Sequence, residues 1–153
     1  MGRWLLGDWQ VNGIFSAQTG PPLDITLSAS SLNAPFNVNR PDLNGSPAIL
    51  GAVGPGMKYF DVTKFSQPAA GRFGTTGRNI LSGPGLVTLD FSLFRKFPIT
   101  ERIHLELRME SFNFTNTPHF NAPNSNFSSS GFGEVTDAQQ DQRQFQIGLR
   151  LLF

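Results

Sequence analysis

The residues that could carry out acid–base or metal chemistry are few and widely spaced in this chain. His104 and His119 are the only histidines, and no metal-ligand spacing joins them. Glu106 and Glu110 share one register of an extended strand, which places them about 13 Å apart by strand rise. That distance exceeds the separation of paired glycosidase carboxylates. We therefore expect these residues to be neither a metal centre nor an enzyme active site.

Other chemical motifs are equally weak. Gly83-Pro84-Gly85 and Gly131-Phe132-Gly133 do not have the spacing of dinucleotide or phosphate loops. The chain has no nucleophile elbow, and without cysteine it forms neither a disulfide nor a thiolate metal site. A formal charge of +1 provides no basic footprint for nucleic acid. The sequence thus predicts no catalytic residue, no cofactor, no bound metal and no nucleic-acid partner.

The clearest strand pattern surrounds the two glutamates. From Arg102 to Glu110, ionisable side chains alternate with apolar ones, and only an extended strand sorts such a period onto two faces. Val87 to Leu93 alternates in the same way, and this strand runs on through Phe97 to the short turn Pro98 to Glu101, which joins the two runs. Val87 to Phe97 would span roughly 36 Å by strand rise, enough to cross the apolar band of an outer-membrane barrel when tilted.

The last stretch, Gln142 to Phe153, alternates with the same period of two. Its apolar register consists of Phe145, Ile147, Leu149, Leu151 and Phe153. We expect the polar side chains of these runs to line a water-filled barrel interior, partly as an ion-pair ladder. This predicted lumen face consists of Arg102, Glu106, Arg108, Glu110, Gln144, Gln146 and Arg150.

The start of the chain predicts a hairpin, and long segments without periodicity follow. Trp9 to Gln18 and Leu23 to Leu27 alternate, with a tight turn at Thr19 to Pro22. Ser30 to Leu86 and Asn113 to Asp141 show no strong pattern and are too long for loops of a compact soluble domain. Short turns that alternate with long loops predict an all-β, antiparallel, up-and-down transmembrane β-barrel segment whose long loops are extracellular.

Composition is compatible with that fold. Charged residues make up only 15% of the chain, mean hydropathy is −0.17, and no apolar run reaches the roughly 18 residues of a membrane-spanning helix. Aromatic residues near the predicted strand ends fit interfacial girdles, although a sandwich core also favours Phe. These aromatic residues are Trp4, Trp9, Phe97, Phe112, Phe114 and Phe153.

Several segments together resemble one family, the Oar-like TonB-dependent receptors, which carry a carboxypeptidase-regulatory-like domain and a plug ahead of an outer-membrane barrel. The matching segments occur in the family's order and cover nearly the whole chain. They are DWQVNGIFSAQTGPPL (8–23), NRPDL (39–43), GRFGTTGRNILSGPG (71–85), LDFSLFRKFPITER (89–102), ESFNFTNTPHF (110–120), FGEVT (132–136) and the terminal RQFQIGLRLLF.

The resemblance implies that residues 1–153 are the C-terminal part of the receptor's barrel, about five strands of roughly twenty-two. It implies that the terminal register ending at Phe153 is the signal read by the outer-membrane assembly machinery. It also implies uptake energised by TonB through a plug that this sequence does not contain. Because no signal peptide, TonB box or plug is present, the hypothesis is that the chain is a fragment of a larger receptor in the outer membrane of a Gram-negative cell.

Two other interpretations remain open from the sequence. A passive porin or adhesin barrel needs the same strands without a plug, and a secreted soluble β-sandwich could bind carbohydrate through Asn-rich loops. In the receptor interpretation, the extracellular loops touch an unidentified small ligand, oligosaccharide or peptide. The candidate contacts are Arg40, Asp42, Arg72 and Arg78.

Overall fold

The computed structural model describes residues 7–28, 32, 38–139 and 142–153. The chain divides into two compact units. The sheet unit comprises Met1–Gln18, Leu86–Pro118 and Gln140–Phe153, and the loop unit comprises Thr19–Gly85 and His119–Gln139. None of the described residues forms a helix that is long and apolar enough to cross a membrane.

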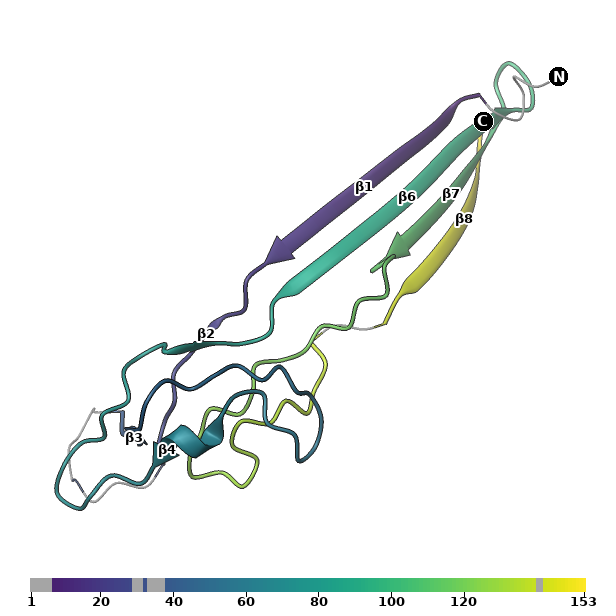
Figure 1. Ribbon diagram of the computed structural model, residues 1–153. Helices are drawn as coiled ribbons and strands as arrows, with labels where there is room; N and C mark the ends of the chain where they lie inside the picture. Colours follow the sequence, from purple (N-terminus) through teal and green to yellow (C-terminus); the bar gives the residue numbers. More distant parts are fainter. Residues whose placement is uncertain (1–6, 29–31, 33–37, 140–141) are drawn as a thin grey trace. The chain divides into compact units, whose positions relative to one another are not determined.

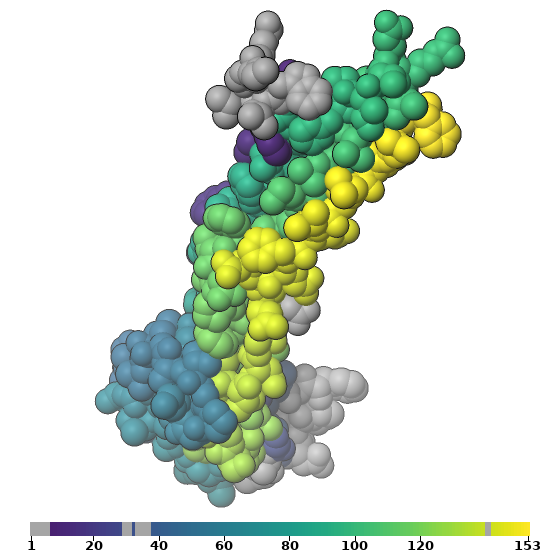
Figure 2. Space-filling model, turned by 90° about the vertical axis from the view of Figure 1, so that its right-hand side faces the viewer, coloured from purple at the N-terminus to yellow at the C-terminus, as the bar shows by residue number. Residues whose placement is uncertain are grey.

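The sheet unit is built from four antiparallel strands (Figure 1). They are β1 (Trp9–Gln18), β6 (Leu86–Pro98), β7 (His104–Phe112) and β8 (Gln144–Leu152), in the order β1-β6-β7-β8. Figure 2 shows β8 in yellow beside β7 in green, as their pairing requires. The predicted all-β, antiparallel fold is confirmed, with four long strands in place of the expected five.

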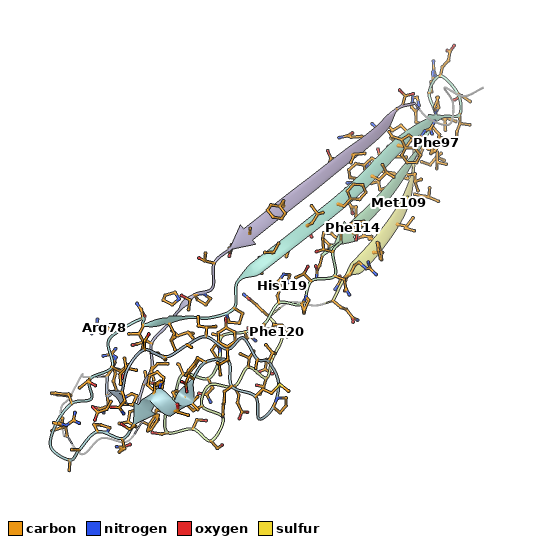
Figure 3. All side chains as sticks on the ribbon, in the orientation of Figure 1. Arg78, Phe97, Met109, Phe114, His119 and Phe120 are labelled. Carbon is orange, nitrogen blue, oxygen red and sulfur yellow. The ribbon has the colours of Figure 1, made fainter. Side chains whose placement is uncertain are left out.

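Strand register gives this sheet two chemically different faces, because residues paired across strands lie on the same side. The apolar face carries Trp9, Val11, Phe15, Val87, Leu89, Phe91, Leu93, Phe97, Leu105, Leu107, Met109, Phe145, Ile147, Leu149 and Leu151. Within the sheet unit these side chains are not packed into a core; Phe15 is 67% exposed and Ile147 is 70% exposed. Figure 3 labels two residues of this face, Phe97 and Met109. The polar face carries the intervening residues, with charges concentrated on β6, β7 and β8.

The predicted hairpin of Trp9–Gln18 with Leu23–Leu27 is wrong. β1 pairs along its whole length with β6 instead, from Trp9 opposite Arg95 to Gln18 opposite Leu86. The alternation of Leu23, Ile25 and Leu27 is real, but these side chains are buried within the loop unit. Alternation with a period of two indicates that one side of an extended segment is buried. It does not identify the strand or core against which that side packs.

The connections are nevertheless short on one side and long on the other. β6 and β7 are joined by a tight turn in which the Ile99 N–H donates to the Ile103 carbonyl at 2.9 Å. The connections from β1 to β6 and from β7 to β8 are the long ones. Thr19–Pro22 therefore does not close a barrel hairpin, and the turn between β6 and β7 is the short one.

The loop unit has a hydrophobic core of its own. Leu23, Ile25, Tyr59, Phe60, Phe65, Leu81, Phe132 and Val135 are buried together. The rings of Phe60, Phe65 and Phe132 meet edge to face, with centroids 5.3 to 5.8 Å apart. Such pairs add about 0.5–1.5 kcal/mol each beyond area burial. The strand pairs are β2 (Pro22–Leu23) with β5 (Leu81–Ser82) and β3 (Asp42–Leu43) with β4 (Phe65–Ser66), and a 3₁₀ turn, η1, spans Val62–Lys64.

Backbone hydrogen bonds join the two long connections into this one unit. The Tyr59 N–H donates to the Gly133 carbonyl at 2.7 Å, and the Gly54 N–H donates to the Val135 carbonyl at 3.0 Å. Phe132–Thr136 accepts these bonds without forming a strand. Phe60 forms an isolated bridge with Ile49. The long connections are therefore folded segments with a shared core.

Candidate functional site on the polar face of the sheet

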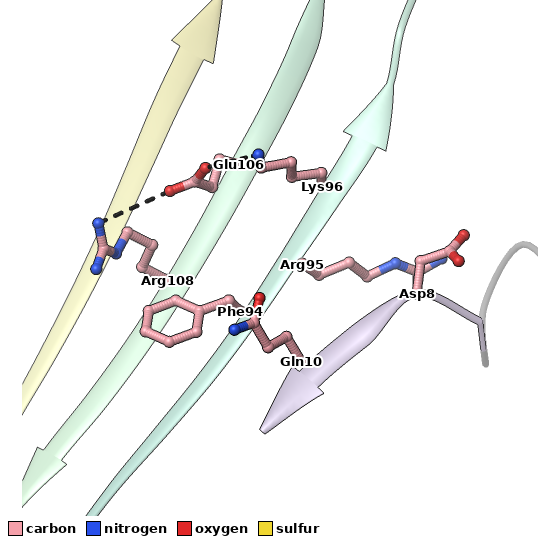
Figure 4. A pocket seen from close by; sticks show the side chains of 7 residues that line it. All are labelled: Asp8, Gln10, Phe94, Arg95, Lys96, Glu106 and Arg108. Carbon is pink, nitrogen blue, oxygen red and sulfur yellow. Dashed lines mark ion pairs between the residues drawn. The ribbon is translucent and has the colours of Figure 1, made fainter. Parts of the chain in front are cut away.

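The charged side chains of the polar face form a ladder across three strands. The register places Lys96 of β6, Glu106 of β7 and Arg150 of β8 in one row. Glu106 lies 3.8 Å from Lys96 Nζ and 3.8 Å from Arg108, and Arg108 lies 3.4 Å from Glu110. Figure 4 draws the side chains of Lys96, Glu106 and Arg108. We call Lys96, Glu106, Arg108, Glu110 and Arg150 the charged ladder.

The N···O distances of these ion pairs are long, and their basic side chains are exposed to solvent. The Lys96 and Arg108 side chains are 67% and 47% exposed, whereas the Glu106 side chain is 14% exposed. Charge-assisted hydrogen bonds are normally about 2.7–2.9 Å long, and exposed pairs contribute only about 0–1 kcal/mol. The ladder therefore presents basic groups to its surroundings more than it stabilises the sheet.

The local sequence explains how Arg108 is oriented. Its guanidinium lies over the Phe94 ring, 4.7 Å from the centroid, and Phe94 is its register partner on β6. On the other side its partner is Gly148, where an added Cβ would come within 4.0 Å of the Arg108 Cβ. An aromatic ring on one side and a missing side chain on the other let the guanidinium lie along the sheet.

A shallow hollow lies at this end of the sheet, beside the β6–β7 turn. It is lined by Asp8, Gln10, Phe94, Arg95, Lys96, Glu106 and Arg108 (Figure 4). Among the described residues, no three His, Cys, Asp or Glu side chains gather as metal ligands. Ion pairing, stacking and hydrogen bonding are the chemistry that this lining offers.

Six of the seven predicted lumen residues do share the polar face: Glu106, Arg108, Glu110, Gln144, Gln146 and Arg150. The placement of Arg102 on the strand is wrong, because β7 begins at His104 and Arg102 lies in the turn. Both backbone groups of Ile103 are used by that turn, its N–H donating to Thr100 Oγ1 at 3.1 Å.

Sequence reasoning missed two members of the site, Lys96 and Phe94. Both lie on the polar register of β6, but the sequence from Phe94 to Phe97 contains no alternation that separates the faces. The available signal was pairing across the turn. Counting back from Glu106 and Arg108 would have placed Lys96 and Phe94 opposite them.

One cation, Arg95, lies on the apolar face. Its guanidinium carbon is 5.1 Å from the Trp9 ring and 4.5 Å from the Phe97 ring, and the residue is 5% exposed. Of the other aromatic residues expected at strand ends, Phe112 lies on the polar face, Phe114 packs 5.6 Å from Phe91, and Trp4 lies outside the described residues.

The residues predicted to form an assembly signal occupy β8 and the position after it. Phe145, Ile147, Leu149 and Leu151 all lie on the apolar face and are exposed, and Phe153 is 97% exposed. Their reading by assembly machinery stays a prediction. The geometry provides a continuous row of apolar side chains along an edge strand.

The loop residues proposed to touch ligand are mostly engaged inside the loop unit. Arg40 binds the Asp24 carboxylate, with its closest contact at 2.7 Å. Arg72 forms a two-pronged ion pair with Asp42, whose Oδ1 also accepts the Thr75 N–H at 3.1 Å. Arg78 lies exposed in a turn. Ligand contact by these residues stays a prediction, since the described geometry gives three of them an internal role.

Electrostatics favour the charged forms of these loop carboxyls. The Arg72 guanidinium holds the pKa of Asp42 below its usual value, and the same pair raises the pKa of Arg72. Lys58, 2.9 Å from Glu134, likewise lowers the pKa of that carboxyl, helped by the Gly56 N–H. Lys58 and Glu134 belong to different long connections, so this pair joins them.

Comparison with known proteins identifies one family. The family described as outer membrane beta barrel domain matches residues 1–146. No curated protein and no solved structure matches the chain.

Proposed function

The chain belongs to the outer membrane beta barrel family and is located in the outer membrane, and from that premise we propose that it forms part of the wall of a TonB-dependent uptake receptor. In this receptor the apolar face contacts lipid, the polar face borders the interior, and the loop unit lies on the extracellular side. The ligand is taken up with energy relayed by TonB through a plug.

One observation carries this proposal: a sheet with one continuous apolar face that its own unit leaves exposed. Leu149 and Ile147 are 68% and 70% exposed on β8, whereas the loop unit of the same chain buries Phe60 completely. The same chain builds a buried core in its loop unit, so it is able to cover apolar side chains. It leaves the apolar face of the sheet uncovered because that face contacts lipid. A soluble sandwich would require a second sheet over it, and family membership supports the membrane instead.

The receptor assignment, as distinct from any barrel, rests on the Oar-like segments. Two of these segments contact each other in the structure. NRPDL and GRFGTT are joined by the ion pair between Asp42 and Arg72 and by the hydrogen bond from the Thr75 N–H to Asp42. A Cβ on Gly74 would lie 2.0 Å from the Arg40 carbonyl oxygen, so glycine is required where these segments cross. These two segments therefore have a structural role in holding the loop unit together.

A passive porin is the second candidate, favoured by the wet, charged polar face. The two functions differ in whether the interior is blocked. We expect the protein purified from outer membranes and inserted into planar lipid bilayers to show no steady conductance until urea unfolds the plug. Steady open-channel conductance without urea would instead establish a passive pore.

Partners follow from the same proposal. Insertion requires the outer-membrane assembly machinery, and uptake requires TonB through the plug. We propose no enzymatic activity, since the ladder offers binding chemistry only. Loss of uptake on removing TonB, with surface binding retained, would be the matching cellular result.

A further inference from the structure

The chain contains two Asn-Gly pairs, and the structure places them in different backbone settings. Asn12-Gly13 lies within β1, whereas Asn44-Gly45 directly follows β3. An asparagine that precedes glycine readily loses its side-chain amide, because no glycine side chain hinders approach of the glycine nitrogen to the asparagine Cγ. Backbone conformation decides whether that approach occurs, so the two pairs should differ in reactivity.

Gly45 is well placed to act as the attacking nitrogen. It lies in a bend after β3 with a φ of 90°, a conformation that glycine adopts at little cost. It is exposed, and a Cβ added there would meet nothing within 4 Å. Within the described part of the chain, its N–H donates no hydrogen bond. No contact therefore has to be broken at the attacking nitrogen.

Two hydrogen bonds hold Asn44 at the end of β3. Its backbone N–H donates to the Lys64 carbonyl at 2.8 Å, and its Nδ2 donates to Ser66 Oγ at 2.9 Å. Asn44 is exposed, and the side-chain bond is a neutral one at the surface. A bond of this kind is weak, and losing it should slow the reaction by at most about tenfold.

Asn12 is equally exposed but is held in an extended strand. β1 pairs with β6 along its whole length, with Asn12 opposite Ser92 and Gly13 opposite Phe91. The extended backbone directs the Asn12 side chain away from the next peptide nitrogen, so attack requires local opening of the strand. Solvent access is therefore the same for the two asparagines, and strand pairing is the difference between them.

We propose that Asn44 is a site of spontaneous deamidation and isomerisation. The Gly45 nitrogen gives its proton to solvent and forms a bond to Asn44 Cγ, the Cγ–Nδ2 bond breaks, and the amide nitrogen takes up a proton and leaves as ammonia. Water then opens the resulting five-membered imide. Opening at Cγ gives aspartate, and opening at the main-chain carbonyl gives isoaspartate, so water is the only other reactant.

The product should loosen the surrounding part of the loop unit. A carboxylate at position 44 can no longer donate to Ser66 Oγ, and it lies two residues from Asp42, whose charge is already paired with Arg72. Isoaspartate also adds one carbon to the main chain beside the β3–β4 pairing, where the Asn44 N–H donates to the Lys64 carbonyl. We expect the modified protein to be more susceptible to protease in this segment.

The two pairs can be compared within one molecule. Outer membranes that contain the protein are incubated at mildly alkaline pH, and the peptides that contain Asn12 and Asn44 are analysed by mass spectrometry. Deamidation changes the mass of a peptide by the difference between NH2 and OH, and an isoaspartate-specific methyltransferase labels the isomerised product. We expect modified Asn44 to accumulate many times faster than modified Asn12.

Unfolding in urea provides the reference, since both pairs should then react at similar rates. Asn44→Gln, whose longer side chain closes a ring far more slowly, should abolish the signal at position 44 and leave the rate at Asn12 unchanged. Ser66→Ala should raise the rate at Asn44 severalfold by releasing the amide. Equal rates at Asn12 and Asn44 in the folded protein, or modification of Asn44 only after unfolding in urea, would overturn the proposal.

Discussion

The sheet unit and the loop unit use the same kinds of residue in opposite ways. In the loop unit Phe60 is completely buried and meets two other rings, while in the sheet unit Phe145 is 65% exposed. Loop-unit ion pairs such as Arg40–Asp24 are short and join distant segments, while the ladder pairs are long and join neighbouring positions. The loop unit is stabilised by its own core, whereas the sheet needs lipid on one face and water on the other.

The largest predicted difference is in core truncation. Phe60→Ala removes a completely buried ring and should cost about 3–5 kcal/mol of loop-unit stability. Limited proteolysis of the protein in detergent should show cleavage within 19–85 at much lower protease concentration. Phe145→Ala, the matched change on the sheet, should leave loop cleavage unchanged, and equal sensitivity of both variants would contradict the separation of the units.

The second comparison is between two positions on opposite faces of β8. Leu149→Arg places a charge on the apolar face and should cost about 2–4 kcal/mol if that position lies near the bilayer midplane. Gln146→Arg places the same charge on the polar face and should cost little. The measurement is the fraction of protein that remains folded in lipid vesicles under urea, and similar losses for both variants would refute the assignment of the faces.

Acid should loosen the loop unit and leave the sheet intact. The pKa values of Asp42 and Glu134 are lowered by Arg72 and Lys58, so their stabilisation is complete above the unfolded-state values and is lost as pH falls below about 4. Protease susceptibility of the loops should rise across that range. Asp42→Asn should already be more susceptible at neutral pH, and a pH-independent profile would exclude this role for the pairs.

The smallest expected effect is the change in sheet stability when one residue of the charged ladder is substituted. Glu110→Gln removes one partner of the 3.4 Å contact with Arg108 and should change sheet stability by about 1 kcal/mol or less. Urea unfolding in vesicles measures it, with Ser92→Ala, the neighbouring polar-face position, as the control. A loss of several kcal/mol would mean that the ladder is a structural element instead of a binding surface.

The long strands were predictable because alternation is a local property. The bounds of Trp9–Gln18 were predicted correctly, whereas the strand predicted from Arg102 to Glu110 begins at His104 and extends to Phe112. What failed was pairing: Leu23, Ile25 and Leu27 alternate as a barrel strand would, yet they are buried in the loop unit. Partner choice depends on contacts between segments far apart in sequence, which periodicity does not encode.

The residues of the candidate site were predictable to the same extent as the strands. Residues on a cleanly alternating strand, such as Glu106 and Arg108, were found, and those reached only across the turn, Lys96 and Phe94, were not. In the long connections, NRPDL and GRFGTT were recognisable as motifs, but their mutual docking through Asp42 and Thr75 depends on a close approach at Gly74. A close approach between two loop segments produces no periodic pattern in the sequence, so it cannot be predicted from periodicity.

The central claim is that adjacent residues of β8 face different solvents. Because the chain has no cysteine, single spin labels can be placed at Ile147→Cys and Gln146→Cys without removing a native thiol. In lipid vesicles, electron paramagnetic resonance should show high accessibility to oxygen, which concentrates in lipid, at position 147 and low accessibility at 146. Equal oxygen accessibility at the two positions, or high accessibility of position 147 to a water-soluble nickel complex, would contradict the account.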